Sequence, residues 1–237
     1  MMKQNNKLQW LKSLSLRQHI RLLLPALIAF LYNCFCYISP KFIVKESQYI
    51  YFASTMDSKV PFVPALIIIY YVSYLQWLNY YLQSSYDTDE EKKYDYYASE
   101  FIIKTICFLF FVFLPISLHR PQIEPGNSLI LKWLKFTYEV DSPMCLFPSV
   151  HCVYSYYSFR YNLKKNDRSA CYTAILQLAF SLLVFASTVC IRQHLLIDIA
   201  GAVVFSEICI QLSVRLHLGK YYRSFCEMLF TKLGLNK

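Results

Sequence analysis

The stretch that decides the fold reads Ser187-Thr188-Val189-Cys190-Ile191-Arg192-Gln193-His194-Leu195-Leu196-Ile197-Asp198 and lies where two strongly apolar segments meet. A guanidinium, an imidazole and a carboxylate in such surroundings are costly unless they pair or face water. If a helix begins near Gln193, His194 and Asp198 form an i,i+4 pair, and the carboxylate can accept from one ring nitrogen and leave the other free. The stretch therefore predicts either a histidine oriented for catalysis or a polar pair that ties two helices together.

The composition indicates a membrane protein that crosses the bilayer several times. Of the 237 residues, 56% are hydrophobic and only 16% are charged, which are too few charges to cover the exterior of a soluble globule. The net charge of +9 could suggest a nucleic-acid partner, but the basic residues form short clusters between apolar runs. That pattern is typical of a cytoplasmic membrane face, and we expect a lipid bilayer, not nucleic acid, as the partner.

Apolar segments near the length that a helix needs to cross the hydrocarbon core recur along the chain. We predict one all-α membrane domain over residues 1–237, with six transmembrane helices at 22–38, 61–82, 97–118, 144–159, 171–191 and 195–216. The fourth segment is short and interrupted by polar residues.

Two further segments are amphipathic. Residues 129–138 alternate apolar residues with lysines and could lie flat on the bilayer surface, and the basic segment 1–19 is either an interfacial helix or a flank of the first span. With both termini in the cytoplasm, the six-span topology places more than twice as many lysines and arginines inside as outside. The positive-inside rule therefore favours cytoplasmic termini in the plasma membrane.

This topology gathers polar side chains from several span ends on the outer face, namely Arg120, Ser149, His151, Arg192, His194 and Asp198. Together they permit phosphoryl transfer. Arginines can clamp the phosphate oxygens, one histidine can attack phosphorus, and a second can protonate the leaving oxygen. Because this face carries no acidic cluster suited to magnesium, we expect no metal and no cofactor.

The same residues resemble a known superfamily. Phe147-Pro148-Ser149-Val150-His151 is similar to the Pro-Ser-Gly-His motif, and Ser187 to Asp198 resembles the Ser-Arg…His-x-x-x-Asp motif, of the type 2 phosphatidic acid phosphatase and vanadium haloperoxidase superfamily. Arg120-Pro121 resembles the end of that family's Lys-x6-Arg-Pro motif. The similarity covers roughly residues 100–205, which would be the catalytic core, and is closest to a divergent bacterial membrane branch.

The resemblance implies a core of antiparallel helices with the site at the outer membrane face. It implies that His194 is the nucleophile, that Asp198 orients it, and that His151 is the general acid. Ser149 and Arg120 would bind phosphate. The implied activity is metal-independent hydrolysis of a lipid or isoprenoid phosphate through a phosphohistidine.

Two positions depart from the family pattern. Phe113 stands where the family has lysine, and Thr188 stands where it has arginine. We place Thr188 in the expected phosphate-binding set by its position, and Arg192, two residues before His194, as a replacement for a missing ligand.

Two other functions remain open on the sequence alone. A lipid phosphotransferase would use the same histidines and pass the phosphoryl group to an alcohol instead of water. A non-enzymatic transporter or assembly protein would line a pathway with polar residues, but it would need them at mid-membrane depth in several spans. The sequence does not identify the lipid.

Overall fold

The computed structural model describes residues 9–124, 126–141, 143–163 and 168–235 and is almost entirely helical. Its helices are α2 (Leu16–Ile38), α3 (Pro40–Ile43), α4 (Thr55–Lys59), α5 (Ile67–Ser85), α6 (Glu90–Phe113), α7 (Leu129–Val140), α8 (Val150–Asn162), α9 (Arg168–Cys190), α10 (Leu196–Leu216) and α11 (Gly219–Lys232). Two 3-10 turns, η1 (Glu46–Gln48) and η2 (Pro64–Leu66), and two short strands, β1 (Ile50–Tyr51) and β2 (Ile116–Ser117), complete the described elements. The strands pair in parallel, with Ile50 opposite Ile116. The all-α expectation is confirmed.

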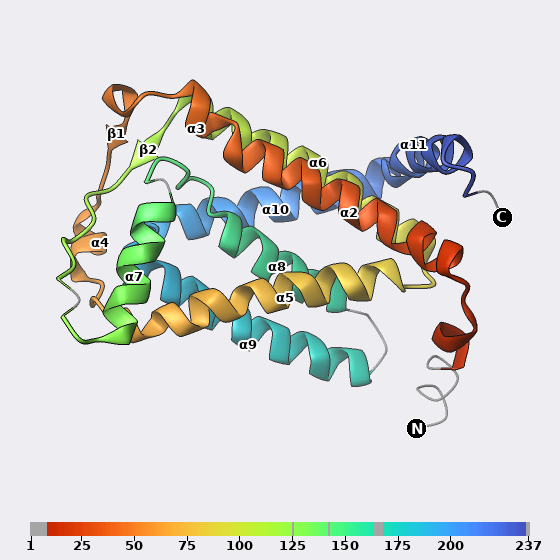
Figure 1. Ribbon diagram of the computed structural model, residues 1–237, viewed down its shortest axis with the longest axis horizontal. Coiled ribbons are helices and arrows are strands. Elements are labelled where there is room, and N and C mark those ends of the chain that lie inside the picture. The colour runs from red at the N-terminus through yellow and green to blue at the C-terminus, as the bar shows by residue number, and fades with distance from the viewer. Residues whose placement is uncertain (1–8, 125, 142, 164–167, 236–237) are drawn as a thin grey trace.

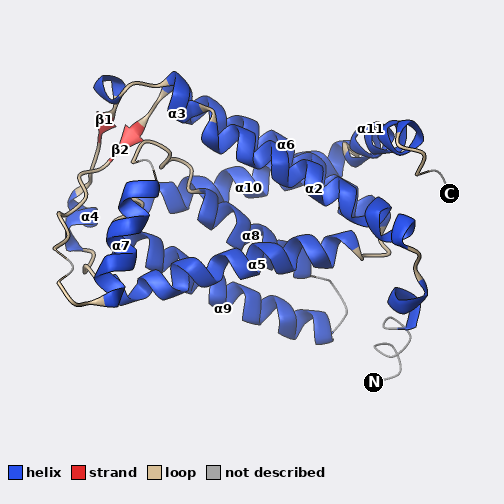
Figure 2. Ribbon diagram, viewed as in Figure 1, coloured by secondary structure: helices blue, strands red, loops and turns tan. Residues whose placement is uncertain are grey.

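Most of the chain is arranged as a bundle along the long axis of the molecule, formed by α2, α5, α6, α8, α9 and α10 (Figure 1). Both described ends of the chain lie at one end of this bundle, whereas α4, α7 and the two strands lie at the other, where loops also gather (Figure 2). Helix α7 crosses that end at a steep angle to the long helices (Figure 1). The helices alternate in direction, so the beginnings of α8 and α10 and the end of α9 meet at the end that carries α7.

Helix α8 is the centre of the bundle and packs against α5, α9 and α10. Most of its residues are buried, although it is rich in tyrosine and serine. Its tyrosines find partners inside the protein: the hydroxyls of Tyr154 and Tyr81 are 2.6 Å apart, and Tyr157 donates to Ser99 at 3.0 Å. Because α8 faces protein, its polar composition costs little.

Four described helices are long and apolar enough to cross a membrane, where the sequence predicted six spans. They are α2 extended through α3 (Leu16–Ile43), α6, Cys171–Cys190 of α9, and α10. The expected spans at 61–82 and 144–159 correspond to α5 and α8, which do not meet the same criteria. Helix α8 has 13 residues, or about 20 Å at 1.5 Å per residue, which is shorter than the hydrocarbon core.

Several expected boundaries were wrong. The third span was predicted at 97–118, but α6 begins seven residues earlier, where Asp89 accepts a hydrogen bond from the amide of Lys92 at 3.1 Å. It ends at Phe113, two residues before Pro115, whose ring cannot continue the helix. Helix α2 begins at Leu16 behind a capping box formed by Ser15 and Gln18, and α11 was not predicted. Residues 1–8 of the basic N-terminal segment lie outside the described residues.

Candidate active site

His194 lies in the tight turn between α9 and α10. The backbone amides of Gln193 and His194 both donate to the carbonyl of Thr188, at 3.0 and 3.1 Å, and this closes the turn. The helix begins at Leu196, not near Gln193 as predicted, so His194 precedes the helix and Asp198 lies in its first turn. The position of Asp198 is favourable because a helix N-terminus stabilises negative charge.

The predicted pair of His194 and Asp198 is present. Nδ1 of His194 lies 3.2 Å from Oδ2 of Asp198, and the same oxygen accepts from the amide of Leu195 at 2.8 Å. The Asp198 side chain is fully buried and that of His194 is 7% exposed. In the tautomer that carries its proton on Nδ1, the ring donates to the carboxylate and Nε2 is left as a free base.

An open cavity of about 780 Å³ lies beside His194. Its lining comes from the segment around α4, from residues 118–121 and from the α9–α10 turn, and includes Arg120, Arg192 and His194. Three of the predicted site residues therefore share one cavity.

Arg120 fastens the end of α7 to this turn. Its Nη1 donates to the carbonyls of Tyr138 and Asp141, at 3.1 and 2.6 Å, and its Nη2 donates to Oε1 of Gln193 at 2.5 Å. Burial lowers the pKa of the Arg120 guanidinium, against the opposing effect of the Asp141 carboxylate. Within the described chain, its Nε and the side-chain nitrogen of Gln193 are buried without a hydrogen-bond partner. Arg120, which lines the cavity, and Gln193, which does not, thus each keep a buried nitrogen without a described partner.

Arg192 is committed to the backbone of the α4 segment. Its Nη1 and Nη2 donate to the carbonyls of Asp57 and Val60, each at 2.7 Å, and its own φ is 55°. The guanidinium lines the cavity, but both terminal nitrogens are used in holding α4 against the turn. The described hydrogen bonds of Arg192 therefore position the α4 segment. The sequence had suggested that Arg192 binds phosphate, but its two terminal nitrogens are already used in these bonds.

Asp57 was missed by the sequence reasoning. Its Oδ1 accepts from the amide of Leu196, the first residue of α10, at 2.8 Å, and its Oδ2 accepts from the amide of Ser54 at 2.8 Å. Burial opposes ionisation of Asp57, but the hydrogen bonds from Leu196 and Ser54 and the charge of Arg192 outweigh it and lower its pKa. The Ser54-x-x-Asp57 spacing is a capping box that could have revealed α4, but no local pattern indicates the long-range bond to α10.

The hydroxyls of Ser149 and Thr188 face the backbone and not the cavity. Ser149 is the N-cap of α8, where its Oγ accepts from the amide of Cys152, and its own amide donates to the carbonyl of Asp198 at 3.3 Å. Oγ1 of Thr188 donates to the carbonyl of Phe185 at 2.8 Å. Both side chains are fully buried. Ser149 thereby joins the start of α8 to α10, the helix that carries Asp198.

His151 lies next to His194 but lines a different cavity. The centroids of the two rings are 6.3 Å apart, and His151 stacks on Tyr70 at 4.1 Å. It lines an internal cavity of about 230 Å³ together with Asp141, another residue that the sequence reasoning missed. Asp141 accepts hydrogen bonds from Tyr37 and from Tyr70, the latter at 2.7 Å. Burial alone would raise the pKa of Asp141, but these hydrogen bonds and the proximity of His151 lower it.

Among the described residues, one group of side chains has metal-ligand spacing, and it is not at this site. Glu91, Asp95 and His217 place one ligand atom each within 4.8 Å of the others, where α6 meets the end of α10. This is the end of the bundle that carries both described chain ends (Figure 1). Around His151 and His194 the side chains of Arg120 and Arg192 lie near the carboxylates of Asp57, Asp141 and Asp198.

Comparison with models of protein families, with curated proteins and with solved structures finds no match for this chain.

Proposed function

We propose that this protein is a metal-independent phosphohydrolase that removes phosphate from a lipid or isoprenoid phosphate. One observation carries the proposal: a histidine held by a buried carboxylate lies on the wall of an open cavity, with an arginine on that wall and a second histidine 6.3 Å away, measured between ring centroids. This is the arrangement expected of the type 2 phosphatidic acid phosphatase superfamily, whose motifs the sequence resembles.

The proposed reaction has two steps. Nε2 of His194 attacks phosphorus, the bond from phosphorus to the lipid oxygen breaks, and His151 gives its proton to that oxygen. Asp198 stabilises the charge that develops on the His194 ring. A water molecule then attacks the phosphohistidine and gives a proton to His151, which restores the free enzyme and releases inorganic phosphate.

Arg120, which lines the cavity and donates to Gln193, supports the binding of phosphate. The two side chains are joined at 2.5 Å, and each keeps a nitrogen without a partner among the described residues. Donors fixed before the reaction are well suited to charge that builds up on the phosphate oxygens. In this proposal they take the place of the family's lysine and arginine. Phe113, at the lysine position, is 77% exposed at the end of α6.

We further propose that α5 and α8 complete a six-helix membrane bundle. Their alternating course along the same axis as the four apolar helices supports this (Figure 1). The positive bias of the sequence then places both termini in the cytoplasm and the His194 cavity at the outer face of the plasma membrane.

The first test is release of inorganic phosphate by the purified protein in mixed micelles with a panel of lipid and isoprenoid phosphates, in EDTA. We expect release that persists in EDTA and is lost in His194→Ala. Absence of release from every substrate, or full activity in the variant, would overturn the phosphohydrolase.

A lipid phosphotransferase is the second candidate, and the size of the His194 cavity favours keeping it. A volume of about 780 Å³ on the side of the nucleophile admits an alcohol far larger than water. A transferase would form a new phosphodiester when alcohol acceptors are added and would release little inorganic phosphate. Product analysis by mass spectrometry separates the two reactions.

A further inference from the structure

His151 points into a cavity that opens toward the flank of the bundle. Besides Asp141 and His151, this cavity of about 230 Å³ is lined by residues of α2 and α5, including Asn33. Nε2 of His151 and Oδ1 of Asn33 are buried and have no hydrogen-bond partner among the described residues. The His151 side chain is 5% exposed and Asn33 is 6% exposed. The wall of this cavity therefore contains two residues, His151 and Asn33, that each have a buried polar atom without a described hydrogen-bond partner.

A larger apolar groove adjoins this cavity between α2 and α5. It has a volume of about 540 Å³ and shares Phe30, Tyr74 and Trp77 with the cavity of His151. The rest of its wall is almost entirely hydrocarbon and aromatic, including Leu27 and Leu78. The shared residues place the polar cavity and the apolar groove side by side.

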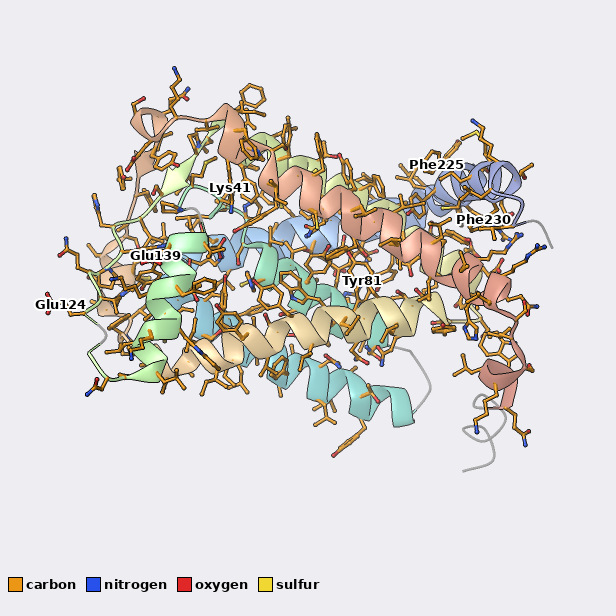
Figure 3. All side chains as sticks on the ribbon, viewed as in Figure 1. Lys41, Tyr81, Glu124, Glu139, Phe225 and Phe230 are labelled. Atoms are coloured by element: carbon orange, nitrogen blue, oxygen red, sulfur yellow. The ribbon has the colours of Figure 1, made fainter. Side chains whose placement is uncertain are left out.

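The groove faces the side of the bundle. Leu27 and Leu78, one on each helix, are 48% and 55% exposed. Tyr81, which also lines the groove, lies between α2 and α5 in the side-chain view (Figure 3). Because α2 is apolar enough to cross a membrane, this side of the bundle is suited to lipid.

The groove runs from the level of His151 toward the end of the bundle that carries the described chain ends. Along α5 its lining extends from Tyr74 to Ser85. The eleven helical steps between these two residues cover about 16 Å, which is close to half of the roughly 30 Å hydrocarbon core. The groove thus has the length and chemistry of a site for one lipid chain whose polar end lies at His151.

The two histidines line different spaces. In phosphoryl transfer the attacking and leaving atoms lie on opposite sides of phosphorus. Here His194 lines the open cavity and His151 lines the α2–α5 space, with their ring centroids 6.3 Å apart. Attack from the open cavity and departure of the lipid oxygen toward the α2–α5 space would meet this requirement.

We propose that the groove between α2 and α5 binds the hydrocarbon chain of the lipid phosphate. The lipid enters sideways from the bilayer and its alcohol leaves the same way, whereas water and inorganic phosphate use the His194 cavity. This inference rests on the proposed function and adds the substrate's hydrocarbon site and its route.

The first experiment fills the groove. Leu78→Trp places a large ring in the groove, and Leu75→Trp is the matched control because Leu75 is an exposed leucine of the same helix that does not line it. With dioleoyl phosphatidic acid we expect Leu78→Trp to lower kcat/KM about tenfold or more, as overpacking of a fitted space does. With dihexanoyl phosphatidic acid, whose chains are too short to need the groove, we expect little change. If both variants lower kcat/KM equally, or if Leu78→Trp lowers it equally for both substrates, the groove does not bind the lipid chain.

The second experiment does not depend on catalysis. His194→Ala protein in micelles is irradiated with a phosphatidic acid that carries a diazirine in mid-chain, and the labelled residues are located by mass spectrometry. We expect labels on Phe30, Leu78 or Leu82, which are suppressed by excess unlabelled phosphatidic acid. If these residues are labelled but the wild type releases no phosphate, the groove binds the lipid chain and the proposed phosphohydrolase activity is wrong. If the wild type releases phosphate but only other helices are labelled, the proposed activity holds and the groove is not the binding site of the lipid chain.

Discussion

At the scale of single residues, the turn between α9 and α10 holds His194 through both its ring and its backbone. The ring pairs with Asp198 and the amide with Thr188. Asp198 also accepts from the amide of Leu195, so one carboxylate fixes both the imidazole and the start of the helix. A change at Asp198 should therefore affect the orientation of His194, the proposed nucleophile, more than the shape of the cavity.

Asp198→Asn should abolish most of the activity and leave the fold intact. The amide can still accept from Leu195, but it carries no charge to stabilise the His194 imidazolium. We expect kcat to fall by about 10³-fold or more, as in other histidines that lose an orienting carboxylate. The measurement is single-turnover phosphate release, with thermal unfolding as the control for folding. An active Asp198→Asn variant would mean that the pair is only a structural tie.

Arg120→Lys should lower both activity and stability. Lysine keeps the positive charge but cannot donate at once to Tyr138, Asp141 and Gln193 in the planar geometry of the guanidinium. We expect a loss of about 2 kcal/mol in the free energy of unfolding, because buried acceptors lose charged donors. Denaturant unfolding in micelles checks this, and Lys132→Arg on the exposed face of α7 is the control. If Arg120→Lys unfolds with the same free energy as the wild type, the hydrogen bonds of Arg120 do not stabilise the protein in this way.

At the scale of elements, α4 stabilises the site although it contributes no predicted catalytic group. Asp57 caps α10 from a distant part of the chain, and Arg192 binds the carbonyls at and just after α4. The sequence indicated the order of the helices because apolar runs and prolines delimit them. It could not indicate this contact, since a cap donated from another helix leaves no local pattern. The contact of Arg192 with the α4 segment also leaves no local pattern, so the sequence suggested a phosphate ligand from the position of Arg192 near His194.

Asp57→Asn should destabilise the protein in a pH-dependent way. The pKa of Asp57 is lowered in the folded protein, so its charge adds stability above the unfolded pKa of about 3.9, and this is lost as the pH falls through the folded pKa. We expect the Tm of the variant to lie below that of the wild type at pH 7, and the two to converge below about pH 4. Thermal scans at pH 7 and pH 3 measure both. A Tm difference that does not change with pH would contradict a role for the charge.

At the scale of the whole molecule, the bundle separates the candidate site from both described chain ends. The sequence predicted the all-α architecture and the grouping of His194 with Asp198, because the apolar runs and the i,i+4 spacing are local signals. It counted the segment of α8 as a short transmembrane span, whereas α8 is not among the described helices that are long and apolar enough to cross a membrane. No local pattern indicated Asp141, because its partners Tyr37 and Tyr70 come from two other helices.

The proposed orientation predicts opposite labelling at the two ends. Glu124 is exposed at the α7 end, as Figure 3 shows, and Lys220 is exposed on α11. A membrane-impermeant maleimide should label Glu124→Cys in intact cells and Lys220→Cys only after permeabilisation. The native thiol of Cys171, exposed near the start of α9, should behave like Lys220→Cys. Labelling of Lys220→Cys in intact cells would contradict cytoplasmic termini.

The short, central α8 also has a consequence for biosynthesis. In a membrane bundle, a helix of 13 residues rich in tyrosine and serine is too short and too polar to partition into lipid by itself. It must wait beside the translocon until α9 and α10 emerge and cover it. His151 and His194 would then meet only when synthesis is nearly complete, so that unfinished chains carry no assembled site.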